Sequence, residues 1–391
     1  MIVPFLSLEE VTALHGAEIN EAVTRTVNSG WYLQGKENKT FEKHFAEYVG
    51  AKYCVGCANG LDALTLIFRA YKEMGVMKEG DEVIVPANTF IATVLAITDN
   101  GLVPVLCEPK EETLEIDDEQ IEGLITPKTK AIALVHLYGR NAYTDRIGEL
   151  CRKYNLKLVQ DCAQSHGLKV NASCAHQVSP HRGDLEGSLV GSFAYSFYPG
   201  KNLGALGDGG AVTTDDEELA TIIRALANYG SQTKYIFDYE GRNSRLDEIQ
   251  AAVLDVKLRY LDEDNAHRQM IARYYYDNIS NPLVTLPQRL DDTQNVYHIF
   301  PVLVAPDHRA ALQEHLANNG IGTIIHYPVA PHQQQCYANA PWNKYNTPTA
   351  DARQLPITES LASRELSLPI GPTITLAQAH HVVEQINKYM R

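Results

Sequence analysis

The stretch KAIALVHLYGRNAYTDRIGELCRKYNLKLVQD, residues 130–161, contains two apolar runs separated by a helical pattern. The runs 130–139 and 156–161 are short and rich in Val, Ile and Leu, whereas 144–155 mixes apolar and charged residues at helical spacing. A strand, a helix and a second strand of these lengths predict a parallel β-α-β unit.

The same alternation continues on both sides of this stretch. Further short apolar runs lie at 53–56, 82–87, 103–109 and 192–198. We therefore expect an α/β architecture with a mainly parallel sheet, whose ligands bind at the carboxyl ends of the strands. The polar residues that fall at those ends are Asn59, Asn88, Asp161 and Lys201.

The pattern changes after about residue 255. The segment 253–279 is apolar on one face and charged on the other, which predicts one long helix. A strand at 296–306 and helices near 308–319 and from Leu376 follow. We expect a large domain over 1–255 and a smaller C-terminal α+β domain over 256–391.

Composition narrows the functional classes. The chain has 391 residues, 45% hydrophobic and 21% charged, and its net charge of −14 disfavours nucleic-acid binding but allows a local basic pocket. Seven cysteines fit reduced thiols, so we expect a cytoplasmic protein. The opening MIVPFLSLEEV lacks the features of a signal peptide, and no apolar run is long enough to span a membrane.

The segment SFYPGKNLGALGDGG, residues 196–210, contains the most informative lysine. A lysine held by tight turns at a strand end can form a Schiff base with a carbonyl cofactor, and Lys201 has this place. A solvated lysine in a Gly-rich loop is the alternative. A phosphate-binding P-loop is excluded, because Asn202 stands where that motif has Ser or Thr.

Two other segments carry candidate polar groups. Asp161 of VQDCAQSHG closes an apolar strand, where a carboxylate needs a partner such as a pyridinium nitrogen; a helix N-cap is the alternative. Asn59 and Gly60 of CANGLDAL turn a strand into a helix whose free amides form an anion site; an ordinary strand-to-helix turn is the alternative.

In this chain order, a phosphate cradle, a carboxylate and a lysine describe a site for pyridoxal 5'-phosphate (PLP). The sequence resembles the DegT/StrS nucleotide-sugar aminotransferases, a fold-type I PLP family, and most closely the branch that aminates C-3 of dTDP-3-keto-6-deoxyhexoses. The segments that carry the resemblance run nearly from end to end: VPFLSL, SGWYLQG, YCVGCANGLDAL, EVIVPANTFIAT, ITPKTKAI, VHLYG, QDCAQSHG, SFYPGKNLGALGDGG, LANYGS, NSRLDEIQAAVL, GIGTIIHYP and LSLP.

The resemblance implies a fold and a reaction. The fold is type I, with a mainly parallel seven-stranded sheet in the large domain. The reaction moves an amino group from L-glutamate to the C-3 keto group of a dTDP-3-keto-6-deoxyhexose. The product would serve deoxyamino-sugar biosynthesis, for lipopolysaccharide O-antigen and other surface glycans or for antibiotics. The enzyme would be a cytoplasmic homodimer with shared active sites, and no metal is implied.

Residue roles follow from the resemblance. Lys201 would form the Schiff base with PLP and move protons during the reaction. The other cofactor contacts implied are the phosphate cradle of Gly60, Leu61 and Ser196, the ring contacts of Phe90, Asp161 and Gln164, and Asn243 reaching the phosphate from a second subunit. The substrate contacts implied are Tyr198, His326 and Tyr327 at the sugar, and Lys234, or Arg245, at the diphosphate.

Each transferred role has a structural alternative. Phe90 fits a core residue and Asn243 a turn or cap. His326 and Tyr327 end an apolar strand, where simple packing accounts for them, and Lys234 fits an ordinary exposed lysine.

Two features depart from the commoner family pattern. Asp208 stands where many members have Glu. The segment 169–190 is long and carries Cys174, His176 and His181, but without the paired spacing of a metal site. Cys54 and Cys57 form a single CxxC, which we interpret as packed thiols.

Four other functions remain to be weighed. A C-4 sugar aminotransferase of the same family shares these motifs. A dehydratase of the superfamily has His in place of the catalytic lysine, and a catalytically silent regulator would have lost Lys201 or Asp161, whereas both are present. An unrelated fold-type I enzyme would lack the HYP and LSLP segments.

Overall fold

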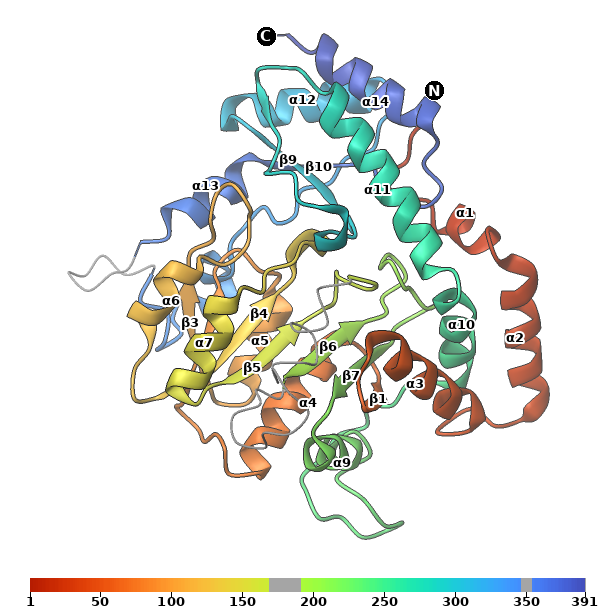
Figure 1. Ribbon diagram of the computed structural model, residues 1–391, viewed down its shortest axis with the longest axis vertical. Coiled ribbons are helices and arrows are strands. Elements are labelled where there is room, and N and C mark those ends of the chain that lie inside the picture. Colours follow the sequence, from red (N-terminus) through yellow and green to blue (C-terminus); the bar gives the residue numbers. More distant parts are fainter. Residues whose placement is uncertain (169–190, 346–353, 391) are drawn as a thin grey trace.

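The computed structural model describes residues 1–168, 191–345 and 354–390. A seven-stranded sheet in the order β1-β7-β6-β5-β4-β2-β3 forms its centre (Figure 1). The strands are β1 Tyr53–Cys57, β2 Glu82–Pro86, β3 Val103–Cys107, β4 Thr129–Val135, β5 Lys157–Asp161, β6 Ser192–Ser196 and β7 Gly210–Thr214. All pairs are parallel except those of β7 with β1 and β6. The expected α/β fold with a mainly parallel seven-stranded sheet is confirmed.

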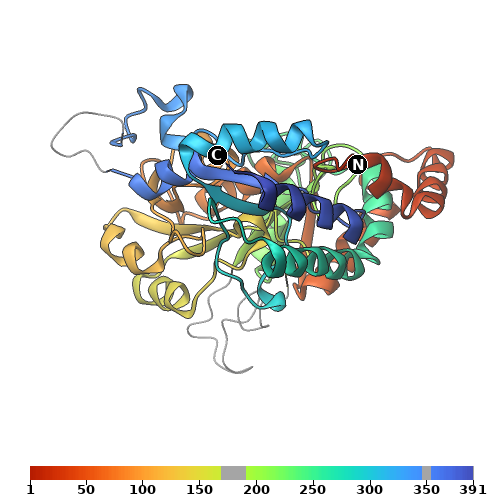
Figure 2. The same cartoon turned by 90° about the horizontal axis from the view of Figure 1, so that it is seen from above.

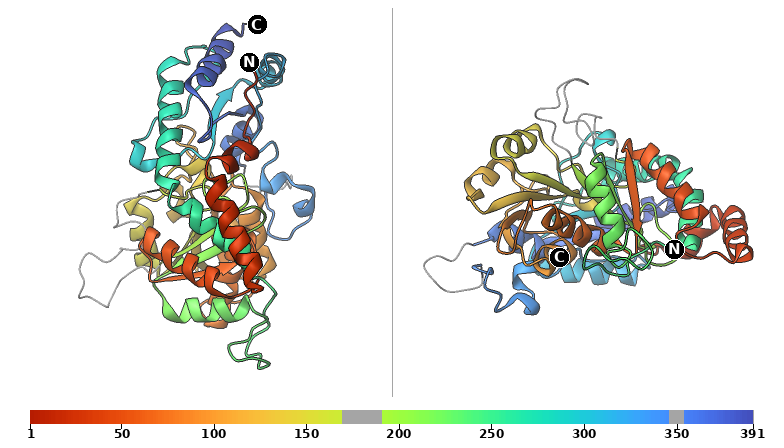
Figure 3. Two further views of the ribbon diagram at one scale, coloured as in Figure 1. Left: turned by 90° about the vertical axis from the view of Figure 1, so that its right-hand side faces the viewer. Right: turned by 90° about the horizontal axis from the view of Figure 1, so that it is seen from below.

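Helices cover both faces of this sheet, as Figure 1 and the view from below in Figure 3 show. They are α1 Leu8–Ala13, α2 Gly16–Ser29, α3 Lys36–Val49, α4 Gly60–Glu73, α5 Ile91–Asp99, α6 Asp118–Leu124, α7 Asp145–Tyr154, α9 Glu217–Leu226 and α10 Glu248–Leu258. In β2, Val83 and Val85 share a core with α4, α5 and α9, whereas Ile84 lies in the core with α6 and α7. Because both faces are covered, the central strands are mostly apolar, with polar residues at or near their ends.

Strand β7 was not predicted from the sequence. It begins at Gly210, at the end of a Gly-rich stretch, continues through the β-branched Val212, Thr213 and Thr214, and is paired on both sides. A Cβ at Gly210 would lie 2.4 Å from the carbonyl carbon of Asn59, so this position needs glycine. The strand thereby brings the end of β1 and the end of β6 to the same edge of the sheet.

A smaller unit lies at one end of the molecule in Figure 1, and Figure 2 looks down on that end. Its antiparallel sheet has the order β10-β9-β8. Its elements are α11 Leu261–Asn278, β8 Val284–Thr285, β9 Phe300–Val304, α12 Pro306–Asn318, α13 Pro356–Arg364, β10 Glu365–Leu368 and α14 Leu376–Lys388. Val3 pairs with Ile321 and lies in the core of this unit, so the start of the chain packs with its end. The predicted division at residue 255 falls within α10 and stays a prediction.

The single long helix expected over 253–279 is wrong. Helix α10 ends at Leu258 and α11 begins at Leu261. The amides of Arg259 and Tyr260 bond to carbonyls three residues back, which closes α10 with a tighter turn. The ring of Tyr260 stacks on His15 at 3.7 Å between centroids, and its hydroxyl donates to Glu18. These tertiary contacts lie where α10 ends and α11 begins, and the hydrophobic periodicity of the sequence does not reveal them.

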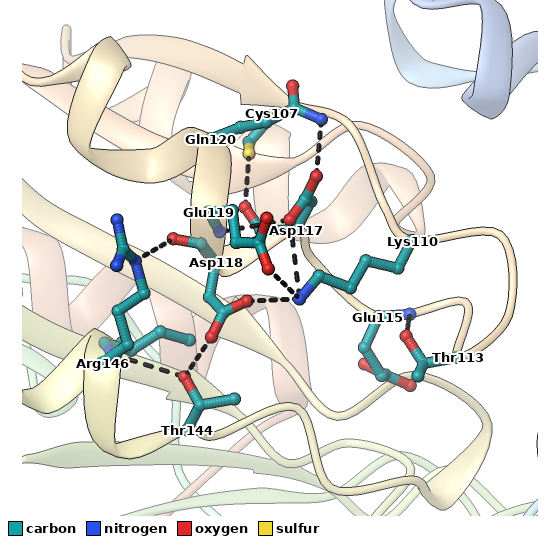
Figure 4. A network of polar contacts seen from close by, with 11 residues as sticks. Cys107, Lys110, Thr113, Glu115, Asp117, Asp118, Glu119, Gln120, Thr144 and Arg146 are labelled. Carbon is teal, nitrogen blue, oxygen red and sulfur yellow. Dashed lines mark hydrogen bonds and ion pairs between the residues drawn. The ribbon is translucent and has the colours of Figure 1, made fainter.

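Four short 3₁₀ turns complete the described elements: η1 Leu137–Gly139, η2 Asp292–Gln294, η3 Pro331–Gln333 and η4 Gln335–Tyr337. A polar network, drawn in Figure 4, ties α6 to α7. The Lys110 ammonium lies 2.7 Å from Asp118, whose other oxygen accepts from Thr144 at 2.7 Å, and Arg146 donates to the Asp118 carbonyl. None of the labelled residues of this network lines the cavity between the large sheet and the smaller unit.

Several other expectations concern single side chains and the membrane. Cys54 and Cys57 are buried free thiols, as predicted. Cys174, His176 and His181 lie outside the described residues. None of the helices in the described parts of the chain combines the length and apolar character that a membrane span requires.

Candidate active site

A cavity of about 690 Å³ lies between the large sheet and the smaller unit. Its volume is typical of small-molecule sites. It is lined by ten of the twelve residues predicted from the sequence: Gly60, Leu61, Phe90, Asp161, Gln164, Ser196, Tyr198, Lys201, His326 and Tyr327. The polar strand ends of the large sheet therefore converge as the parallel topology requires.

Lys201 stands in the turn that follows β6. Its amide donates to the carbonyl of Tyr198 at 2.8 Å, which holds the turn closed. Burial lowers the pKa of the Lys201 amino group to about 8, although the negative charge of Asp161 opposes this shift. A larger fraction of the amine is therefore neutral near pH 7 than for an exposed lysine, as a nucleophile or base requires.

Asp161 ends β5 with its carboxylate buried. One oxygen accepts the amide of Ala163 at 3.0 Å, and the other accepts the hydroxyl of Thr93 at 2.8 Å. Burial raises the pKa of Asp161, whereas these two hydrogen bonds and the charge of Lys201 favour the ionised form. The carboxylate is thus oriented from two sides and still lines the cavity.

The start of helix α4 forms an anion cradle. Asn59 uses its side chain to accept the amide of Asp62 at 2.8 Å and its carbonyl to accept that of Ala63 at 3.0 Å. Among the described residues, the amides of Gly60 and Leu61 have no such acceptor. A Cβ at Gly60 would lie 2.5 Å from the Cβ of Ser196, so the glycine lets the helix approach that hydroxyl. Two free amides, a hydroxyl and the positive end of the helix dipole thus lie together at the start of α4, where an anion can bind.

Aromatic and amide groups form the opposite wall. The ring of Phe90 is half-exposed and lies 5.0 Å from that of Tyr327, tilted by 39°. Gln164 accepts the amide of Tyr138 and donates to the Tyr327 hydroxyl at 3.0 Å. Gln164 therefore already has partners within the chain, and its predicted contact with a ring hydroxyl stays a prediction.

His326 comes from the smaller unit and faces the same cavity. Burial, and to a lesser degree the charge of Lys201, lowers the pKa of His326 to about 4, so its imidazole is neutral near pH 7. Tyr198, on the other side, is 57% exposed. The two residues leave polar atoms free at the mouth of the cavity.

The structure does not bring Lys234 and Asn243 to this cavity. Both are exposed in the segment between α9 and α10, which projects from the body of the molecule (Figures 1 and 3). Lys234 lies over the ring of Tyr235 at 5.1 Å, and Arg245 donates to the side chain of Asn228. The predicted contacts of Lys234 and Asn243 therefore stay predictions.

Sequence reasoning missed two buried groups at the site. The hydroxyl of Thr93 donates to Asp161 and lies 3.0 Å from the hydroxyl of Thr89. A threonine in the first turn of an apolar helix gives no sign in the sequence that it orients a carboxylate. Arg268 from α11 lines the cavity, and its Nε lacks a partner among the described residues. Only the packing of the two units reveals it.

His298 is a third missed residue, and its tautomer follows from its neighbours. Asn202 donates both amide hydrogens, to Asn265 and to the carbonyl of Val296, so its oxygen accepts from Nδ1 of His298 at 3.1 Å. Nε2 of His298 therefore carries no proton. Burial holds the pKa of His298 well below its ordinary value, which keeps Nε2 an acceptor in the cavity.

These features fit PLP. The cradle at Gly60 and Ser196 suits a phosphate, the oriented carboxylate of Asp161 suits a protonated ring nitrogen, and the amine of Lys201 suits an aldehyde carbon. The distinguishing observation is the close approach at Gly60, which leaves no room for a side chain and turns free amides toward the cavity.

Comparisons with known proteins agree with this geometry. A model of the DegT/DnrJ/EryC1/StrS aminotransferase family matches residues 14–387. The chain is 48% identical over 99% of both chains to dTDP-3-amino-3,6-dideoxy-alpha-D-galactopyranose transaminase of Aneurinibacillus thermoaerophilus. DesV of S. venezuelae has a TM-score of 0.89 and 41% identity, over 99% of this chain and 98% of that one. NtdA of Bacillus subtilis, solved with bound PMP, has a TM-score of 0.86 and 30% identity, over 98% and 84%.

Proposed function

The chain belongs to the DegT/DnrJ/EryC1/StrS aminotransferase family, and we propose that it aminates the C-3 keto group of a dTDP-3-keto-6-deoxyhexose with L-glutamate as donor. At the coarser level it is a PLP-dependent sugar aminotransferase of the dTDP-aminosugar type. The observation that carries the proposal is the cavity in which Lys201 and Asp161 face the free polar atoms of His326 and Tyr198. The name of the 48% identical relative supports the C-3 position.

Different residues of the chain would bind the cofactor and move protons. Bound PLP supplies an electron sink for the carbon that loses its proton. The amides of Gly60 and Leu61 would hold the phosphate, and the charge of Asp161 would keep the ring nitrogen protonated. Lys201 takes the proton from the donor's Cα and later returns one to the sugar carbon, and its lowered pKa near 8 suits both directions.

The sugar's position follows from the walls of the cavity. Tyr198, His326 and Tyr327 would bond sugar oxygens while the 3-keto carbon lies over the cofactor. A site built on such hydrogen bonds discriminates strongly against a sugar that leaves them unpaired. The diphosphate would then point outward, toward the positive charge of Lys234 or Arg245 from a second subunit.

A homodimer with shared sites completes this proposal. The segment between α9 and α10 exposes Tyr235 by 80%, Ile236 by 57% and Phe237 by 61%. Trp31 is exposed by 64%, and the neighbouring Leu33 forms a bridge with Asp247, just beyond that segment. Clustered apolar side chains of this kind favour burial against another subunit. We expect the dimer to act in the cytoplasm, in deoxyamino-sugar biosynthesis for O-antigen or antibiotic sugars.

A product assay tests the proposal. The purified enzyme is given L-glutamate with dTDP-3-keto-6-deoxygalactose, with its gluco epimer, or with a 4-keto isomer. NMR of the product locates the new C–N bond. We expect efficient amination at C-3 and poor turnover of the 4-keto sugar, with Lys201→Ala as the inactive control. Nitrogen at C-4 without turnover of either 3-keto sugar would replace this proposal by the C-4 alternative.

A further inference from the structure

A buried polar pair lies behind His326 and has no part in the reaction described above. Glu365, the first residue of β10, and Ser367 stand two residues apart and share one face of the strand. Their exposed fractions are 2% and 0%. Neither residue lines the cavity, so any effect they have on the substrate acts through a neighbour.

That neighbour is His326. Its backbone amide donates to one carboxyl oxygen of Glu365, and the hydroxyl of Ser367 bonds the other oxygen. The same hydroxyl lies 2.9 Å from Nδ1 of His326. A continuous chain therefore runs from Glu365 through Ser367 to Nδ1. The bond to Ser367 uses Nδ1, so Nε2 on the far side of the ring is left for a ligand in the cavity that His326 lines.

The charge of Glu365 determines the direction of every hydrogen bond in this chain. An ionised carboxylate can only accept, so the Ser367 hydroxyl donates to it and its oxygen accepts the proton of Nδ1. Because a neutral imidazole carries one N–H, Nε2 is then an acceptor. A protonated carboxyl reverses the chain: it donates to Ser367, Ser367 donates to Nδ1, and Nε2 carries the proton.

We propose that Glu365, acting through Ser367, sets the tautomer of His326 and thereby decides whether the sugar meets a donor or an acceptor at Nε2. Both are positioning residues, because they contact His326 and not the substrate. The inference rests on the proposed function, which places a sugar oxygen against His326. It contrasts with His298, whose Nδ1 is held by a side-chain amide that does not titrate.

The groups around Glu365 indicate the pH at which the tautomer changes. Burial raises the pKa of Glu365 to about 8, opposed by Ser367, by the amide of His326 and by the charge of Arg309 from α12. Tyr138 and Tyr327 also face it and stay neutral, since burial raises their pKa values. Below about pH 8 the carboxyl is protonated and Nε2–H donates; above it Nε2 accepts.

The conservative variant Glu365→Gln separates this inference from a structural role. The amide oxygen of Gln accepts the backbone amide of His326, so its NH₂ faces Ser367 and donates, as the protonated carboxyl does. The variant should keep the sugar kcat/KM within about 3-fold at pH 7, where the native carboxyl is protonated. Between pH 7 and 9.5 the native enzyme should lose about 10-fold in sugar kcat/KM, the order of one hydrogen bond, and the variant should not.

A direct test observes the tautomer in the PLP-bound enzyme without sugar. Histidine is labelled with ¹⁵N, and the signals of His326 are identified by their absence in His326→Asn. As pH rises through 8, the proton should move from Nε2 to Nδ1 in the native enzyme and remain on Nε2 in Glu365→Gln. Ser367→Ala should uncouple the tautomer from pH, and it provides the test if the Gln variant does not fold.

A matched control is Glu359→Gln, because Glu359 bonds His332 at 3.1 Å outside the cavity. It should behave as the native enzyme does. One tautomer of His326 from pH 6.5 to 9.5 in the native enzyme, or the same transition in Glu365→Gln, would overturn the inference. Since the NMR experiment contains no sugar, failure of the proposed C-3 activity would appear only in the product assay and would leave this test intact.

Discussion

The inner wall of the cavity and the segment between α9 and α10 differ in how far one chain completes them. Lys201 and Asp161 on the inner wall are held by hydrogen bonds and burial within the chain. In the segment 229–243, Lys234 and Asn243 are exposed beside an 80% exposed Tyr235. The difference teaches that one chain positions the residues of the inner wall, whereas the roles proposed for Lys234 and Asn243 depend on a proposed second subunit. Substitutions on the inner wall should therefore reduce enzyme activity more than substitutions in the segment between α9 and α10.

The largest effect is expected for Lys201→Ala. It removes the amine that we propose bonds PLP and moves protons, and general acid–base groups alone contribute up to about 10⁴-fold. Borohydride treatment followed by mass spectrometry should attach the cofactor to Lys201 in the native protein and to no residue in the variant. Lys153→Ala on the surface of α7 is the control. Normal turnover by Lys201→Ala would contradict the PLP assignment.

Asp161→Asn should reduce kcat by about 10²-fold, since a preorganised charge at a reacting ring has effects of this size. Thr93→Val keeps the shape of the side chain but leaves one oxygen of Asp161 without its donor, and should cost about 10-fold. Thr65→Val on α4 is the matched control, because its buried hydroxyl has no partner among the described residues. A near-native kcat in Asp161→Asn would contradict a catalytic role of Asp161 and favour the alternative that it only caps the backbone.

Mixed dimers test whether the two regions come from different subunits. Asn243→Asp places a negative charge near the partner's phosphate, so each variant alone should be inactive. Mixing Lys201→Ala with Asn243→Asp subunits should rebuild one intact site per heterodimer. Activity is measured on heterodimers purified by two different tags. If they remain inactive, each site is built from one chain, and the contrast between the two regions does not hold.

The smallest effect is expected for Lys234→Ala. An exposed lysine contributes at most about 1 kcal/mol, so KM for the nucleotide sugar should rise about 3- to 5-fold with kcat unchanged. The difference should shrink at high salt, which screens exposed charges. Measuring KM at two ionic strengths separates this effect from misfolding. An unchanged KM for the sugar would assign the diphosphate to Arg245 instead.

The sequence alone determined those features of the fold and of the site that depend on local sequence patterns. Alternating apolar runs and helical spacing are visible in 130–161, so the α/β class and the placement of Asp161 and Lys201 at strand ends could be inferred from the sequence. The strand-to-helix turn indicated Gly60, and the family motifs added Ser196 and the residues of the HYP segment. Ten of the twelve predicted residues share one cavity for this reason.

Only the tertiary structure decided what depends on contacts between distant segments. β7 exists because β1 and β6 pair with it, and the chain turns at Tyr260, where His15 and Glu18 hold the side chain. The hydrogen-bond directions at His298 and His326 depend on partners such as Asn202 and Glu365, which lie far from them in the chain. Periodicity reports burial along one segment, whereas a tautomer depends on which donor the fold places opposite each ring nitrogen.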